Sequence, residues 1–392
     1  MDRCHWRTSQ FAARNGTGGG CSLDLVAATM QEAHETGRGD PSEADAARHV
    51  VSLAEGLVVA LALLSRLTHL RHHRNRLDRV QPGDRSQPLL REAVWATRTV
   101  AGCHNALAVS IETLSETSCF GGRIGFYQHA SESNHCDMRF SVFVPPQAAA
   151  GKVPVVTFLS GLTNTEEDFM EKSGAQRVAA DLGIMLVSPD TSPRGDGVPD
   201  DPEGEYDFGL SAGFYLNATE EPWSHHYNMY DYVTRELQAA VFHNFPGDIG
   251  RHGLTGYSMG GHGALTVGLR NPDMFRSLSA FAPICTTLNS PWGRKALGHY
   301  LGSDTAAWTE YDASEVARGV TDTGHWGKIL VDQGNDDPFL AEQLHPELLE
   351  QACAESGLEL ELRYHAGYDH SYYFISTFIE DHLRHHATAL GL

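Results

Sequence analysis

Short apolar runs alternate with longer amphipathic stretches over most of the chain after residue 120. Segments 138–144 and 358–364 alternate polar and apolar residues, and short apolar segments predict further strands at 153–159, 184–187, 277–281 and 329–331. Helices are predicted at 166–182, 229–242, 258–270 and 371–386. This alternation is typical of an α/β fold, in which helices cover both faces of a mostly parallel sheet. Ligands of such sheets bind at the carboxyl ends of the strands.

The first 108 residues have a different composition. They contain 13 Arg, no Lys and 11 acidic residues, whereas residues 109–392 contain 16 basic and 39 acidic residues. The apolar segment 50–64 is shorter than the ~20 residues that a membrane-spanning helix needs. We expect residues 1–108 to form a poorly ordered or partly helical N-terminal extension, and residues 109–392 to form the main domain. A further hypothesis is that the natural protein starts at Val109.

Composition excludes several classes of protein. A chain of 392 residues with 41% hydrophobic residues can bury a sizeable core, so wholesale disorder is excluded. The net charge of −21 argues against electrostatic binding to nucleic acid or anionic lipid. Seven scattered cysteines without a C-x-x-C pair favour neither a disulfide framework nor a zinc site. We therefore expect a reducing compartment, the cytoplasm, with no nucleic-acid or membrane partner.

The segment Gly256-Tyr-Ser-Met-Gly260 is a G-x-S-x-G motif between a predicted strand and a predicted helix. Small residues on both sides of the serine allow a strained turn that exposes its hydroxyl at the start of the helix. Ser258 is therefore a candidate nucleophile, and a plain glycine-rich turn is the alternative.

A serine nucleophile needs a base and an acid that orients the base. Three aspartates follow the predicted strand 329–331, namely Asp332, Asp336 and Asp337, and the spacing from Gly334 favours Asp337. The alternative is that all three solvate a turn. His370 is the candidate base because it precedes the last helix, whereas His365, His382, His385 and His386 are expected to be solvated. His262 is interpreted as a packing residue or one that supports the site.

A tetrahedral intermediate of acyl transfer requires two backbone N–H donors. The residue after the nucleophile, Met259, should supply one of them, and Leu162 in the loop after segment 153–159 is the candidate for the other. A simple glycine turn is the alternative for Leu162. We expect neither a metal nor an organic cofactor, since no HExxH, P-loop or dinucleotide fingerprint is present.

The chain from about Cys119 onward resembles the S-formylglutathione hydrolase (esterase D) family of the α/β-hydrolase fold. The resemblance is carried by segments 160–163 (SGLT), 188–195 (SPDTSPRG), 213–215 (GFY), 218–223 (ATEEPW), 256–265 (GYSMGGHGAL), 281–285 (FAPIC), 291–293 (PWG), 332–334 (DQG) and 367–374 (GYDHSYYF). It implies a catalytic triad of Ser258, Asp337 and His370, with Leu162 and Met259 as oxyanion donors. In this chain Asn164 stands where the family often has cysteine, so inactivation by thiol reagents at that position is not expected.

The resemblance also implies a reaction. S-formylglutathione would be hydrolysed to glutathione and formate through an acyl-enzyme, a step of formaldehyde removal. The small-molecule thioester is then the expected partner, and a homodimer remains open. The alternatives are a broad short-chain carboxylesterase and a binding protein on the same fold that has lost catalysis.

Removal of residues 1–108 should leave catalysis nearly unchanged, because every candidate catalytic residue lies after residue 160. The measurement compares kcat/KM and the melting temperature of the full chain with those of a chain that starts at Val109. A fall in kcat/KM of more than about tenfold, which is ~1.4 kcal/mol of transition-state stabilisation, would show that the extension belongs to the working fold.

Overall fold

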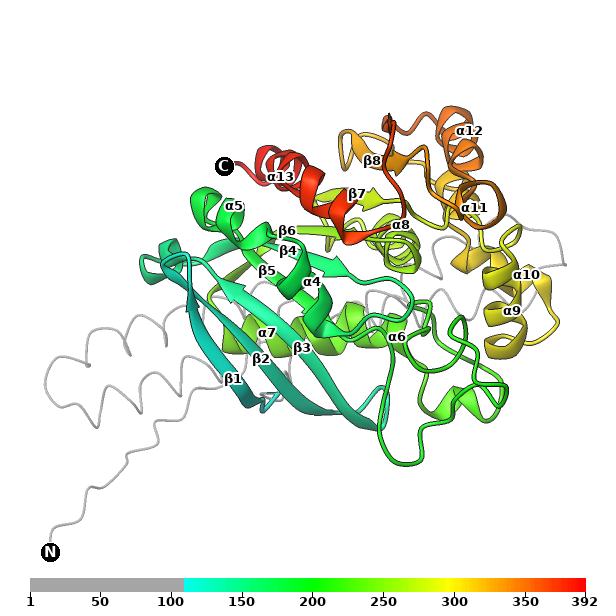
Figure 1. Ribbon diagram of the computed structural model, residues 1–392, viewed down its shortest axis with the longest axis horizontal. Coiled ribbons are helices and arrows are strands. Elements are labelled where there is room, and N and C mark those ends of the chain that lie inside the picture. The colour runs from blue at the N-terminus through cyan, green and yellow to red at the C-terminus, as the bar shows by residue number, and fades with distance from the viewer. Residues whose placement is uncertain (1–108) are drawn as a thin grey trace, which may run out of the picture. The chain divides into compact units, whose positions relative to one another are not determined.

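A nine-stranded sheet runs through residues 109–392, the part of the chain that the computed structural model describes (Figure 1). The order of the strands across the sheet is β1-β2-β3-β5-β4-β6-β7-β8-β9. Their bounds are β1 Glu112–Cys119, β2 Gly122–Ser131, β3 Cys136–Val144, β4 Val153–Leu159, β5 Met185–Pro189, β6 Gly247–Gly256, β7 Ser277–Phe281, β8 Ile329–Gly334 and β9 Leu360–His365. The six strands from β5 to β9 in this order are parallel, and β1, β2 and β3 are antiparallel.

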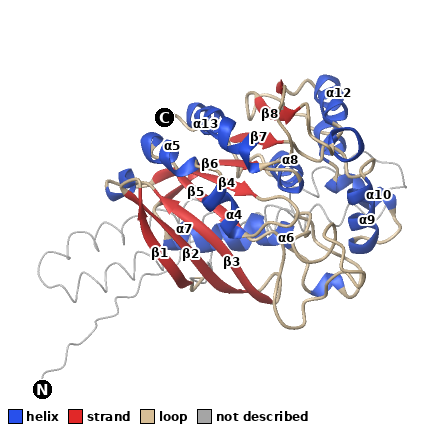
Figure 2. Cartoon of the chain, viewed as in Figure 1, coloured by secondary structure: helices blue, strands red, loops and turns tan. Residues whose placement is uncertain are grey.

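Helices cover both faces of this sheet (Figure 2). Figure 1 shows α4 and α5 in front of the sheet and α7 behind it, and α13 packs beside α5. The helices are α4 Glu166–Lys172, α5 Ala175–Leu182, α6 Met229–Asp231, α7 Leu237–Asn244, α8 Met259–Arg270, α9 Pro291–Tyr300, α10 Thr305–Trp308, α11 Ala313–Arg318, α12 Pro346–Ser356 and α13 Tyr372–Ala389. All residues of β4, β5, β7 and β8 are buried, as expected of strands covered on both faces. The predicted fold class is confirmed.

The prediction from the sequence missed the hairpin formed by β1 and β2 and the interruptions of two helices. All but the last residue of β1 are exposed, so the strand has no buried side chains to produce an apolar alternation. The helix predicted at 166–182 is divided into α4 and α5, because Gly174 takes a left-handed conformation with φ of 68°. The helix predicted at 229–242 contains a π-helical turn at 232–236 and continues to Asn244.

The prediction that the histidines of the last helix are solvated is wrong. His382 and His386 are fully buried between α13 and the sheet, and His385 is partly buried. His386 contacts the hydroxyl oxygens of Ser277 and Ser279 at 2.6 and 2.9 Å. His365 is also largely covered, with Nε2 3.2 Å from Asp332. These histidines were missed because the serine hydroxyls and the carboxylate that lie beside their rings are supplied by distant strands.

Two further expectations from the sequence concern the N-terminal extension and a membrane-spanning helix. The N-terminal extension, with its apolar segment 50–64, lies outside the described residues. Within residues 109–392, no helix has the length and apolar character needed to cross a membrane.

Burial of His386 should make the fold sensitive to acid. Burial, with His385 and His382 nearby, lowers the pKa of His386 well below its ordinary 6.5. The unfolded chain therefore binds a proton that the folded chain does not, and stability falls as the pH drops below about 6.5. A His386→Gln variant should lose less melting temperature between pH 7 and pH 5 than the wild type.

His243 provides the matched control, because it is an exposed histidine in α7. A His243→Gln variant should keep the wild-type dependence of melting temperature on pH. Equal acid sensitivity in the wild type and the His386→Gln variant would contradict the proposed linkage.

Candidate active site

Ser258 occupies a strained turn between β6 and α8. Its φ and ψ are 57° and −120°, values that a residue with a side chain seldom adopts. The turn is held by backbone hydrogen bonds, from Ser258 N to Phe281 O at 2.9 Å and from Ile284 N to Ser258 O at 3.2 Å. A Cβ atom on Gly260 would lie 2.0 Å from the Leu159 carbonyl oxygen, so the second glycine of the motif lets α8 approach β4. The hydroxyl of Ser258 is thereby presented at the carboxyl edge of the sheet.

Asp337 and His370 form a tightly bonded pair. His370 Nδ1 lies 2.5 Å from Asp337 Oδ2, and the side chain of Asp337 is fully buried. The carboxylate also accepts hydrogen bonds from Phe339 N at 2.8 Å and Gln333 Nε2 at 3.1 Å. Since an ionised carboxylate only accepts, His370 carries its proton on Nδ1 in this pair. Nε2 is then available as a base toward Ser258, which lines the same cavity.

The other two candidate aspartates are directed elsewhere. Asp336 is exposed, although it is adjacent to Asp337. Asp332 is buried and accepts two hydrogen bonds of 2.6 Å from the Arg363 guanidinium. Burial acts to raise the pKa of Asp332, but hydrogen bonds from Arg363 and His382 hold it well below its usual range. Asp332 therefore has a structural ion pair of its own and does not contact His370.

The two candidate oxyanion donors come from separate elements beside Ser258. Met259 is the first residue of α8, and Leu162 lines the cavity that contains Ser258. Neither backbone N–H donates a hydrogen bond to a protein group within residues 109–392. The loop that carries Leu162 approaches Ser258 closely, because a Cβ atom on Gly161 would be 3.0 Å from Ser258 Cβ. Both amides are thus available to an oxygen bound in the cavity.

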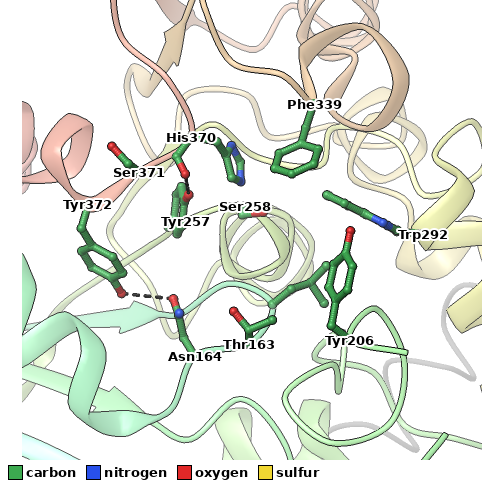
Figure 3. A pocket seen from close by; sticks show the side chains of 11 residues that line it. Thr163, Asn164, Tyr206, Tyr257, Ser258, Trp292, Phe339, His370, Ser371 and Tyr372 are labelled. Carbon is green, nitrogen blue, oxygen red and sulfur yellow. Dashed lines mark hydrogen bonds between the residues drawn. The ribbon is translucent and has the colours of Figure 1, made fainter. Parts of the chain in front are cut away.

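The cavity beside Ser258 is small and has aromatic walls (Figure 3). Its volume is about 270 Å³, and Tyr206, Trp292, Phe339 and Tyr372 line it. The ring centroids of Trp292 and Phe339 are 4.7 Å apart. Tyr206 and Phe339 come from loops, Trp292 from the start of α9 and Tyr372 from the start of α13, so no local motif marked them as neighbours.

Two residues near the cavity refine the sequence-based interpretation. Tyr257, the variable residue before the nucleophile, donates a hydrogen bond of 2.7 Å to the carbonyl oxygen of His370 and so ties the two loops together. Asn164 accepts a hydrogen bond of 3.3 Å from the Tyr372 hydroxyl. His262 is buried in α8 and does not line the cavity, and burial lowers its pKa to about 4. A signal for Tyr257 existed in the sequence, because its position in the motif places it beside the nucleophile.

A serine on the turn from a parallel strand to a helix, facing a histidine–aspartate pair, defines the serine hydrolases of the α/β-hydrolase fold. The family model Esterase matches residues 131–385. The S-formylglutathione hydrolase of Mus musculus is 48% identical over 284 residues, which are 72% of this chain and 100% of the mouse protein. This chain belongs to the S-formylglutathione hydrolase family.

Two further comparisons agree with this membership. The S-formylglutathione hydrolase of Arabidopsis thaliana is 50% identical over 291 residues, covering 73% of this chain and 100% of the plant protein. A solved structure of the S-formylglutathione hydrolase of Agrobacterium tumefaciens matches with a TM-score of 0.69 and 48% identity, covering 71% of this chain and 100% of that chain. Each relative is therefore matched over its whole length, and more than a quarter of this chain lies outside each match.

Proposed function

We propose that this chain hydrolyses S-formylglutathione to glutathione and formate. The observation that carries the proposal is the near-half identity to S-formylglutathione hydrolases over their whole length. It is supported by His370, which pairs with Asp337 and lines the same cavity as Ser258.

In the proposed mechanism, Ser258 Oγ attacks the formyl carbon while His370 Nε2 takes the hydroxyl proton. The carbon–sulfur bond then breaks, and His370 returns the proton to the leaving thiolate of glutathione. Water attacks the formyl ester of Ser258 in the second half, with His370 again taking and returning one proton. Formate leaves and the serine hydroxyl is restored.

The neighbouring groups would stabilise the charges that form in each half-reaction. Asp337 would keep His370 in the tautomer that accepts at Nε2, and would stabilise the imidazolium. The N–H groups of Leu162 and Met259 would donate to the oxygen of the tetrahedral intermediate, an effect of ~2.7–4 kcal/mol for one such donor. The working compartment is proposed to be the cytoplasm, where glutathione is reduced and unpaired thiols such as Cys285 and Cys353 persist.

Comparison of two substrates tests the proposed function. Purified full-length chain should show a higher kcat/KM for S-formylglutathione than for p-nitrophenyl acetate by at least about tenfold, because binding of the glutathione part adds ~1.4 kcal/mol or more in the transition state. A higher kcat/KM for p-nitrophenyl acetate would favour a broad short-chain carboxylesterase. Absence of turnover, with no labelling of Ser258 by diisopropyl fluorophosphate, would favour a binding protein.

Adjacent aspartates provide a matched test of the orienting acid. Asp337→Asn should lower kcat by roughly 10²–10⁴, because an amide can hold His370 in the wrong tautomer and does not stabilise the imidazolium. Asp336→Asn removes the same charge one residue away on an exposed side chain and should leave kcat within about twofold, or ~0.4 kcal/mol. Ser258→Ala sets the background rate in these assays. A larger loss for the Asp336 variant would reverse the assignment.

A further inference from the structure

A second, larger cavity lies at the same edge of the sheet as the candidate active site. It is a groove of about 470 Å³ whose lining includes Gln128, Arg139, Thr165, Glu166, Asp190 and Arg194. Thr165 follows Asn164, which lines the cavity beside Ser258, so the two cavities adjoin at one peptide bond. The mechanism proposed above uses none of the residues in this groove.

Glu166 is the unusual member of the groove. The residue is only 3% exposed, yet its carboxylate has no hydrogen bond to another residue and no ion pair within the described part of the chain. Its backbone is firmly placed, because Ser141 Oγ donates a hydrogen bond of 2.7 Å to the Glu166 carbonyl oxygen. Burial and the nearby Asp190 raise the pKa of Glu166 to about 7. A buried carboxylate is costly unless a cation pairs with it, so this side chain is suited to a cationic ligand.

The two arginines of the groove differ in their partners. Arg194 is occupied, because it donates to both oxygens of Asp190 at 2.6 and 3.0 Å and to Ser211 Oγ at 2.7 Å. Arg139 is exposed on β3, donates only to Gln128 Oε1 at 3.3 Å, and forms no ion pair with another described residue. Asp137 and Glu167 also line the groove, but both are exposed, so Glu166 is its buried carboxylate without an ion pair and Arg139 is its guanidinium without one among the described residues.

We propose that this groove binds the α-amino acid head of the γ-glutamyl group in the thiol half of the substrate. The ammonium group would pair with Glu166, and the α-carboxylate would pair with Arg139. An α-amino acid carries both charges on one carbon, which matches a groove in which a buried carboxylate and a guanidinium both lack an ion-pair partner among the described residues. This inference rests on the proposed function, because it assumes that the thiol half is glutathione.

The reach of glutathione agrees with the separation of the two cavities. Ser258 follows β6, the loop of Leu162 follows its neighbour β4, and the groove lies over the ends of β5 and β3, the next strands along. Neighbouring strands are ~4.8 Å apart, so the groove is displaced from the nucleophile by roughly 10–15 Å along the sheet edge. Seven bonds join the sulfur of glutathione to the γ-glutamyl Cα. At ~3.5 Å for every three bonds of extended chain, they span about 8 Å. The thioester carbon and the bond to Ser258 add the remaining length.

Calorimetric binding of two unreactive ligands tests the pairing with Glu166. The ligands are S-methylglutathione and its glutaryl analogue, which has hydrogen in place of the ammonium group. The wild type should bind S-methylglutathione at least about tenfold more tightly than the glutaryl analogue, because a charge-assisted hydrogen bond contributes about that much to affinity. The Glu166→Gln variant should bind the two ligands with affinities within about twofold. Glu171→Gln removes an exposed carboxylate from the same helix and should keep the wild-type ratio.

An analogue without the α-carboxylate tests Arg139 in the same way. The wild type should prefer S-methylglutathione to its 4-aminobutyryl analogue, and the Arg139→Gln variant should lose that preference. Melting temperatures of all variants show that each one folds. A wild-type ratio retained in the Glu166→Gln variant would overturn the inference even if S-formylglutathione is hydrolysed. Absence of hydrolysis by the wild type would instead contradict the proposed function, and the turnover assay reports it separately.

Discussion

The contact between the start of α8 and the end of β4 is the constraint on which the site depends. The carbonyl oxygen of Leu159 occupies the space that a side chain on Gly260 would need, so the helix starts directly against the strand. This contact forces Ser258 into its left-handed conformation and directs its hydroxyl away from the sheet. It also brings the Met259 N–H to the same place as the loop after β4. The candidate nucleophile and both candidate oxyanion donors therefore depend on one close approach of two backbones.

The parallel sheet brings the remaining groups to this turn. Six neighbouring strands run in one direction, in the order β5, β4, β6, β7, β8 and β9 across the sheet. The loops that follow these strands therefore lie at one edge of the sheet. Asp337 follows β8 and His370 follows β9, so both reach back across β7 toward β6. The Tyr257 hydroxyl holds the His370 loop beside Ser258 through a hydrogen bond of 2.7 Å to the His370 carbonyl oxygen. The same edge continues over β5 and β3, where it forms the groove that contains Glu166.

Local patterns predicted the strands that are buried on both faces and failed for the exposed hairpin. Segment 153–159 is apolar throughout, and the structure has a strand with these same bounds. The strand β1 contains mostly polar residues, and its pairing with β2 is made by backbone groups that carry no sequence signal. The histidines of α13 show the opposite failure, because residues that are polar by type are buried against serines of β7. The pattern of polar and apolar residues therefore predicts burial correctly only where a segment packs against apolar residues or faces water.

The amino-acid sequence by itself determined the fold class, the turn around Ser258 and the candidates His370 and Asp337. These features follow from short-range order, since a strand, a glycine turn and a helix each leave a local pattern. Only the tertiary structure showed that Asp337 is buried beside His370 while Asp336 is exposed, and that Asp332 forms an ion pair with Arg363. It also assembled the aromatic cavity and left Glu166 without a partner. Burial and pairing of charges depend on residues far apart in the chain, so no local pattern could reveal them.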